Sequence, residues 1–280
     1  MNIKLPNKDK KIMKNKIIII FVIVILLILL GIVINKENSS KENVTQVGDG
    51  EIKTDEEYNN LKSQFDTIFT NKLESNYDLS KIKLENSEKE LVYTTLEAKE
   101  TSTNDYDIKI DIPYINIDSE IAKKINNEIN QFSEKYKSIL NKKNKNIIYD
   151  VEYCATIEED ILSLVIKSNL KEGTSAQRVI IQTYNYDLKN NTQVKLQDII
   201  LQKNIDKNYV QNKINEEIKK AQKNAEDLNS LGYNIYERNI DDDIYILKNI
   251  DQYCIYKGNI YIFFAYGNDA RTSEMDLVII

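Results

Sequence analysis

Histidine and tryptophan are absent from the 280-residue sequence, which also has only two cysteines, two prolines and seven glycines. Without histidine, the protein has no Ser/His/Asp or Cys/His nucleophile pair, no HExxH metal site and no imidazole general base. An enzyme with this sequence would depend on carboxylates, lysine or tyrosine. Because 41% of the residues are apolar and 29% are charged, the composition is that of a globular protein and not of a disordered chain.

One long charge-free run, residues 17–34, consists almost entirely of isoleucine, leucine and valine. As a helix it would span about 27 Å, close to the roughly 30 Å hydrocarbon core of a bilayer. Residues 1–16 carry six lysines and one aspartate, a net charge of +5 that the positive-inside rule keeps in the cytoplasm. We therefore predict a cytoplasmic tail (1–16), an uncleaved single-pass transmembrane helix (17–34) in the cell membrane, and an extracellular C-terminal domain. A cleaved signal peptide is the alternative, but its apolar stretch would be shorter.

The charge balance outside the tail is acidic, since 32 basic and 43 acidic side chains give a net charge of −11. This balance argues against nucleic acid as a partner, because phosphates need clustered lysine and arginine. A long-range negative field favours a basic partner, although solubility alone would also explain it.

Two segments precede the main domain. Residues 35–53 are polar, have no hydrophobic period and are predicted to form a flexible stalk. Residues 54–75 are predicted to form an amphipathic helix that packs on the domain or on a partner helix. The apolar stripe of this helix consists of Tyr58, Leu61, Phe65, Ile68, Phe69 and Leu73.

Residues 90–280 alternate strand and helix patterns, which predicts an α+β domain with a largely antiparallel sheet and two packed helices. The helices are expected from Asp118 to about Lys142 and from Asp206 to about Asp227. Ile108, Ile110 and Ile112 alternate along one strand, and Gly258-Asn259 is expected to form a hairpin turn. The strands are expected at 105–114, 147–156, 161–170, 178–188, 192–196, 252–266 and 274–280.

A sequence pattern that occurs twice suggests two related half-units. Residues 124–129 (KINNEI) match 213–218 (KINEEI), and each helix is followed by a Tyr-Cys strand, a turn and an apolar strand. Chance is the alternative, because the chain is rich in isoleucine, lysine and asparagine. Cys154 and Cys254 occupy equivalent places in the two halves and are a candidate disulfide outside the membrane. Two separate thiols are the alternative.

The loop after the second helix holds the candidate binding residues. Tyr233 and Tyr236 are candidates for a contact surface, and Asp241, Asp242 and Asp243 follow them. The aspartates do not form an EF-hand loop, since position 246 is isoleucine where a glycine is required. No catalytic residue, metal site or cofactor is predicted.

A family resemblance rests on the hairpin at 183–200 (TYNYDLKNNTQVKLQDII), the helix at 214–224 (INEEIKKAQKN) and the closing strands NIYIFFAYGN and EMDLVII. In these segments the chain resembles the extracytoplasmic domain of RsiV-type anti-sigma factors and the N-terminal domain of PdaC-type peptidoglycan deacetylases. The resemblance implies an α+β sensory or binding domain at a Gram-positive cell surface, and in the anti-sigma members this domain recognises lysozyme. The turn at residues 173–177 lacks the histidine that members often carry there. The sixteen-residue tail is too short to hold a sigma factor, and no deacetylase domain follows, so neither activity is expected.

Together these patterns predict a membrane-anchored, extracytoplasmic, non-enzymatic binding or sensory domain. Its ligand is expected to be a cell-wall component or a basic secreted protein such as lysozyme. A carboxylate-based cell-wall glycan hydrolase is one alternative, because carboxylate pairs can hydrolyse glycans without histidine. An accessory subunit of a membrane complex, paired through the 54–75 helix, is the other.

Overall fold

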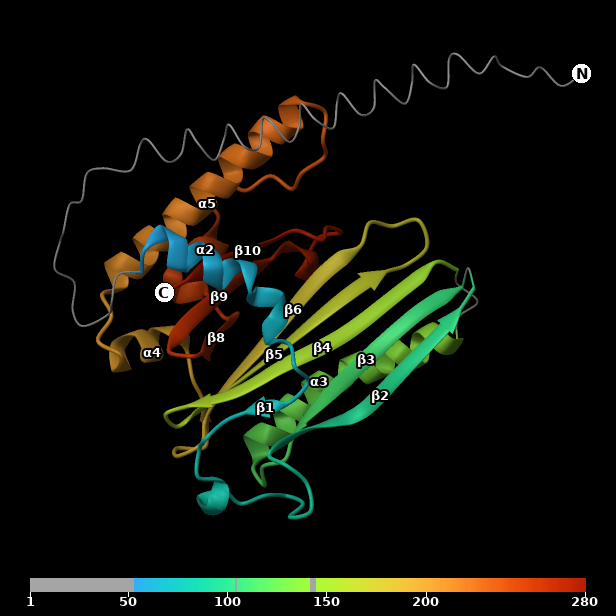
Figure 1. Cartoon of the computed structure of the whole chain (residues 1–280), viewed down its shortest axis with the longest axis vertical. Helices are drawn as coiled ribbons and strands as arrows, with labels where there is room; N and C mark the ends of the chain where they lie inside the picture. Colours follow the sequence, from blue (N-terminus) through green and yellow to red (C-terminus); the bar gives the residue numbers. More distant parts are fainter. Residues whose placement is uncertain (1–52, 104, 142–144) are drawn as a thin grey trace, which may run out of the picture. The chain divides into compact units, whose positions relative to one another are not determined.

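The chain folds into two β-sheets, one of seven strands and one of three. The computed structural model describes residues 53–103, 105–141 and 145–280, which belong to one compact unit (Figure 1). The predicted tail, transmembrane helix and nearly all of the stalk lie outside these residues. None of the helices in the described part of the chain is long and apolar enough to cross a membrane.

The larger sheet has seven strands in the order β2-β3-β4-β5-β6-β7, with β1 beside β4. The antiparallel pairs dominate, as predicted, and the β3–β4 and β1–β4 pairs are parallel. The β3–β4 pair is parallel because α3 carries the chain back across the sheet between them. The bounds are β1 Leu73–Glu74, β2 Val92–Ser102, β3 Tyr106–Ile115, β4 Ile147–Glu158, β5 Ile161–Lys171, β6 Arg178–Asp187, β7 Thr192–Gln193 and α3 Glu120–Asn141.

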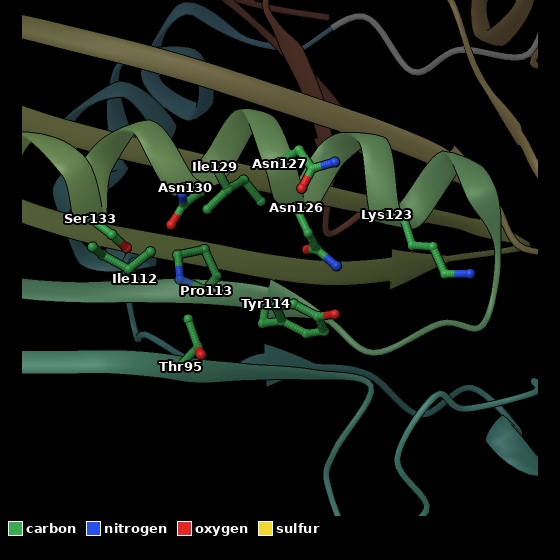
Figure 2. Close-up of a pocket in the computed structure, with 10 residues that line it drawn as sticks. All are labelled: Thr95, Ile112, Pro113, Tyr114, Lys123, Asn126, Asn127, Ile129, Asn130 and Ser133. Atoms are coloured by element: carbon green, nitrogen blue, oxygen red, sulfur yellow. The ribbon is translucent and has the colours of Figure 1, made fainter.

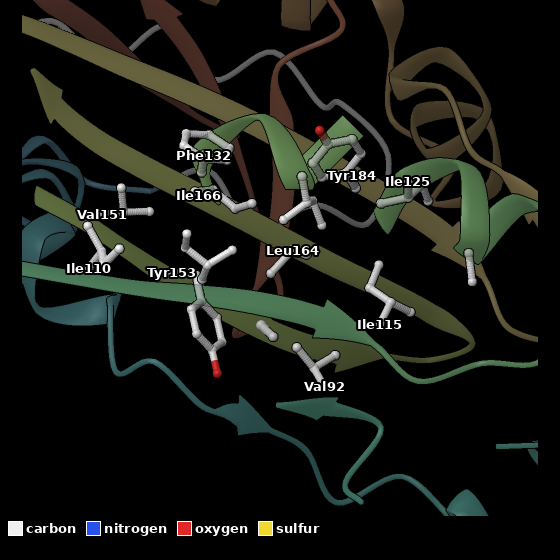
Figure 3. Packing of buried hydrophobic residues seen from close by; sticks show 14 of the residues in the cluster. Val92, Ile110, Ile115, Ile125, Phe132, Val151, Tyr153, Leu164, Ile166 and Tyr184 are labelled. Atoms are coloured by element: carbon white, nitrogen blue, oxygen red, sulfur yellow. The ribbon is translucent and has the colours of Figure 1, made fainter. Parts of the chain in front are cut away.

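One face of this sheet packs on α3 and forms the largest apolar cluster (Figure 3). The predicted alternation in β3 is confirmed, since Ile108, Ile110 and Ile112 are all buried. Ser119, and not the predicted Asp118, caps the helix, because its Oγ accepts the Ala122 N–H at 3.0 Å. Asp118 is instead paired with a lysine. From α3, the side chains in the cluster are Ala122, Ile125, Ile129, Phe132 and Ile139.

The smaller sheet has three antiparallel strands in the order β10-β9-β8, so the apolar β9 is central. The β8–β9 turn is formed by Lys257 and Gly258, with φ +49° and +77°, one residue earlier than expected. The predicted strand at 192–196 shortens to the two residues of β7, because Leu196, Ile199 and Ile200 are buried at helical spacing in α4. The bounds are β8 Tyr253–Tyr256, β9 Asn259–Ala265, β10 Met275–Ile279, α4 Leu196–Gln202 and α5 Lys207–Ser230. Four short 3-10 turns are η2 Leu79–Lys81, η3 Asp243–Tyr245, η4 Leu247–Asn249 and η5 Tyr266–Asn268.

The predicted helix over 54–75 is wrong in its extent. The helix α2 spans Asp55–Ser63, and a 3-10 turn, η1, spans Phe65–Ile68. Asn71 then adopts φ +55°, which is incompatible with a right-handed helix, and the chain enters β1. Tyr58 and Phe65 are buried in a cluster that includes residues of β9 and β10, so the apolar stripe packs on its own domain.

The two Tyr-Cys strands are placed equivalently. Tyr153 of β4 packs in the cluster under α3, and Tyr253 of β8 packs in the cluster with α5. Cys154 and Cys254 both turn away from these helices into a third cluster, to which both sheets contribute. The two halves therefore share a helix, a tyrosine beneath it and a cysteine on the opposite side.

Candidate binding groove

A polar groove of 670 Å³ lies beside β6, between α3 and the segment that leads into β8. We call it the α3–β6 groove. Its volume is within the range of about 300–1,000 Å³ that is usual for ligand sites. Its lining is dominated by carboxamides and consists of Asn127, Glu128, Gln131, Ile180, Gln182, Thr183, Tyr184, Asn185, Gln193, Val194, Lys195, Asp251, Gln252 and Asn268.

The outer edge of β6 is closed in this groove, although β7 pairs only with residues 186–187. The N–H groups of Val179, Ile181 and Thr183 donate to the Thr272 carbonyl, Asn268 Oδ1 and Gln252 Oε1 at 3.2, 3.0 and 2.9 Å. Asn268 also donates its Nδ2 to the Ile181 carbonyl at 2.9 Å. Side-chain amides thus take the place of a neighbouring strand, so a ligand cannot extend the sheet here.

Other polar groups of the groove have no partner among the described residues. The side chains of Asn127, Glu128, Gln193, Lys195 and Asp251 are exposed and make no hydrogen bond or ion pair there. They come from α3, β7, the start of α4 and the segment before β8. Because these exposed groups are bonded to water and not to the protein, a ligand can replace that water without disrupting bonds within the fold, and these five form the candidate ligand contacts.

The floor of the groove is fixed. Tyr184 is only 7% exposed, and its hydroxyl donates to Gln182 Oε1 at 3.2 Å. Gln131 of α3 donates to the same oxygen at 2.8 Å, which links the helix to β6. Burial, followed by the nearby Glu128 carboxylate, raises the pKa of Tyr184, so this phenol stays protonated at neutral pH.

A second pocket of 290 Å³ lies on the other side of α3, against the end of β3 (Figure 2). Asn126 closes part of it by accepting the Ile115 N–H at 2.9 Å and donating to the Ile115 carbonyl at 2.8 Å. Asn127 lines both this pocket and the α3–β6 groove. The smaller pocket therefore adjoins the same helix as the groove and does not form a second candidate site.

The face of the large sheet opposite α3 is mixed in charge, because the strand register places Lys99, Lys109, Lys167 and Lys171 among Glu97, Asp107, Asp111, Asp150 and Glu152. Burial raises the pKa of Asp111, and the Glu97 charge, on its cross-strand partner, adds to this shift. The pKa of Asp150 is raised by burial and then by the Asp107 charge. Lys167 binds Glu152 at 3.1 Å, so lysines on this face already neutralise much of the carboxylate charge.

The sequence-predicted binding residues are not brought together. Tyr233 is 62% exposed just beyond α5, and Asp241, Asp242 and Asp243 are exposed in a turn. None of them lines either pocket described above. Within the described residues, no group of three or more acidic or cysteine side chains could hold a metal ion.

Tyr236 alone belongs to a buried network. Its ring stacks on Tyr266 with centroids 4.3 Å apart, and Arg238 lies against both rings. Arg238 pairs with Glu274 at 2.6 Å and with Asp276 at 2.9 Å, and the Tyr266 hydroxyl donates to Asp276 at 2.5 Å. Because the polar groups bond one another, this network fixes the loop to β10 and offers few free groups to a ligand.

Cys154 and Cys254 are free thiols in the structure, and each is 1% exposed. They nevertheless lie in one buried cluster. Burial raises the pKa of Cys154 to about 12 and that of Cys254 well above its ordinary value.

Sequence reasoning missed the groove, because its residues are asparagines and glutamines without a spacing pattern, spread from 127 to 268. The Arg238 network left a weak signal in the sequence. Arginine occurs only three times, and Glu274 and Asp276 are two residues apart, so their side chains lie on the same face of a strand.

Comparison with known proteins gives only distant likenesses. No family model and no curated protein matches the chain. A DUF3298-family protein from Pseudomonas aeruginosa matches with 11% identity and a TM-score of 0.37, covering 67% of this chain and 87% of its own. A DUF3298-family protein from Bacteroides fragilis matches with 12% identity and a TM-score of 0.38, covering 68% and 88%. Likenesses at this level carry no conclusion about the function of this chain.

Proposed function

We propose that this protein is a non-catalytic binding or sensory domain, held outside the cell by the 17–34 membrane anchor, and that the α3–β6 groove is its ligand site. The observation that carries the proposal is the set of exposed polar side chains in this groove that lack protein partners. Buried polar groups are normally bonded within the fold, whereas these exposed groups are bonded to water and can exchange it for a ligand. The ligand is a cell-wall component or a basic secreted protein.

A basic protein is supported by charge. The net charge of −11 outside the tail attracts cations at long range, and Glu128 and Asp251 are exposed carboxylates in the groove itself. Lysozyme is the first ligand to test, because the family resemblance points to it.

The test is a calorimetric titration of the full chain in detergent micelles with lysozyme. We expect binding that weakens at least several-fold between 50 and 300 mM salt, because surface electrostatics are screened. Exchanging Glu128 for glutamine and Asp251 for asparagine, the two exposed carboxylates of the groove, should weaken it further. Absence of binding to both lysozyme and purified cell-wall fragments would refute the proposal.

The anchor is tested separately. The native protein should resist alkaline extraction from membranes, and protease added to intact cells should digest the domain. Recovery of the protein in the soluble fraction would contradict the anchored arrangement.

A further inference from the structure

Asparagine side chains in this protein repeatedly bind the backbone of an extended segment. Asn126 takes both the N–H and the carbonyl of Ile115, and Asn268 does the same with Ile181. Asn229 bonds both groups of Ile235, at 2.7 and 3.0 Å. A carboxamide carries an acceptor oxygen and an NH2 donor side by side, so it can pair with both the N–H and the carbonyl of a single residue in an extended segment, where these two groups point the same way.

The α3–β6 groove holds further carboxamides that are not engaged in this way. Asn127 and Gln193 make no side-chain hydrogen bond among the described residues. Gln252 accepts from the Thr183 N–H through Oε1, which leaves its Nε2 donor without a partner. These groups lie around one space of 670 Å³ and can pair with peptide units of a bound chain.

The lining disfavours a sugar ligand. Sugar rings are commonly bound against exposed aromatic faces, but Tyr184, the aromatic residue among the lining side chains, is 93% buried and belongs to the main apolar cluster. Ile180 and Val194 supply partly buried apolar surface that suits the alternating side chains of an extended peptide.

The charged side chains of the groove favour a ligand with a basic group. Glu128 and Asp251 are exposed and unpaired, whereas Lys195 is the one cation in the lining. A peptide with a basic side chain would gain a partner for one of the carboxylates. Binding as an added strand is excluded, because the outer N–H groups of β6 are already bonded.

We infer that the α3–β6 groove binds an extended polypeptide segment that carries a basic side chain, with side-chain carboxamides, and Asn127 above all, pairing with its backbone. This inference rests on the proposed function, since it names the ligand class of the same groove.

The probe is a library of fluorescein-labelled decapeptides with a central lysine, measured by fluorescence anisotropy with the full chain in detergent micelles. A second library with N-methylated backbone amides lacks the peptide donors, and a third has a central glutamate. We expect the lysine library to bind and the other two to bind at least fivefold more weakly.

Two variants test the assigned residues. Asn127→Ala should weaken binding about five- to thirtyfold, the effect of losing one or two hydrogen bonds. Glu128→Gln should remove most of the preference for lysine over glutamate. Asn212→Ala and Glu216→Gln, which alter exposed residues of α5, are the matched controls and should change nothing.

The inference is overturned if N-methylation has no effect, if Asn127→Ala binds as well as the unaltered protein, or if no peptide binds. Chitohexaose, a neutral N-acetylated glycan, distinguishes a failure of the peptide inference from a failure of the groove as a binding site. Chitohexaose binding that is lost in Asn127→Ala would reject the peptide class and keep the groove as a binding site. Failure of peptides, chitohexaose and lysozyme together would reject the proposed function as well.

Discussion

Lys62 of α2 and Glu217 of α5 form an ion pair in which Nζ lies 2.9 Å from Oε2. The Glu217 side chain is only 9% exposed, and Lys220 binds its other oxygen at 2.9 Å. On the same side of α2, the Tyr58 hydroxyl donates to the Leu277 carbonyl and the ring faces Lys213. The first helix of the described chain is therefore fixed to α5 and β10 by buried polar contacts.

The first prediction concerns pH. Burial alone would raise the pKa of Glu217, but hydrogen bonds from Lys62 and Lys220 outweigh it and hold the pKa below its usual value. A carboxyl with a lowered folded pKa stabilises the protein above the unfolded pKa of about 4.3, and this stability is lost as the pH falls through the folded pKa. Glu217→Gln should reduce the free energy of unfolding at pH 7 and flatten its decline between pH 5 and 3. Urea unfolding at several pH values measures both effects, with Glu216→Gln as control; parallel profiles for Glu217→Gln and the unaltered protein would contradict the assignment.

The second prediction concerns Arg238. Its guanidinium is 7% exposed and binds Glu274 and both oxygens of Asp276. Lysine cannot reproduce this forked geometry, so Arg238→Lys should lower the free energy of unfolding by about 2–4 kcal/mol. Arg271→Lys alters an exposed arginine and should change it by no more than about 0.5 kcal/mol. Equal effects of the two substitutions in a denaturation series would show that the network adds no stability.

The third prediction concerns the contact between η5 and β6. A Cβ on Gly267 would lie 2.1 Å from the Val179 carbonyl oxygen and 2.7 Å from that of Thr272. Because both are backbone atoms, Gly267→Ala should destabilise the protein by about 3 kcal/mol or more. Gly173→Ala is the control, since its φ of +63° is strained for alanine but its surroundings are open. That change should cost only about 1 kcal/mol, and thermal unfolding that ranks the two in the reverse order would contradict the packing.

The fourth prediction concerns the thiols. Since burial raises the pKa of Cys154 to about 12 and shields both sulfurs, neither cysteine should react with a disulfide reagent at pH 8 in the folded protein. Two thiols should react after unfolding in guanidinium without reductant. No reactive thiol in guanidinium would identify a Cys154–Cys254 disulfide instead, and fast reaction of the folded protein would contradict the buried cluster.

Much of the fold follows from periodicity. The alternation of Ile108, Ile110 and Ile112 predicted β3, and the apolar stripes of α3 and α5 predicted both long helices, because each pattern needs one buried face. Helix ends were less accurate, as the shortened α2 and the Ser119 cap show. A stripe indicates which face is buried, but it does not specify where the helix ends: α2 ends at Ser63 and is followed by a 3-10 turn, although the stripe continues to Leu73.

The candidate site was not predictable in the same way. Asn126, Asn127 and Asn268 are chemically identical in the sequence, and yet Asn126 and Asn268 bond the backbone of other segments while Asn127 has no such partner. Tyr233, Tyr236 and the three aspartates were chosen for composition and nearness in sequence, and composition does not specify which side chains share a cavity.

The order of polar and apolar residues by itself determined strands β3 to β6 and β8 to β10, helices α3 and α5 and the acidic charge of the domain, because local periodicity and ionisation do not depend on distant contacts. Strands β1 and β2 and helix α4 were not predicted. Only the tertiary structure decided which amides close the edge of β6, which remain open to a ligand, and that both cysteines enter one buried cluster. These properties depend on distances between segments up to about 140 residues apart in the sequence, and such distances are set by packing.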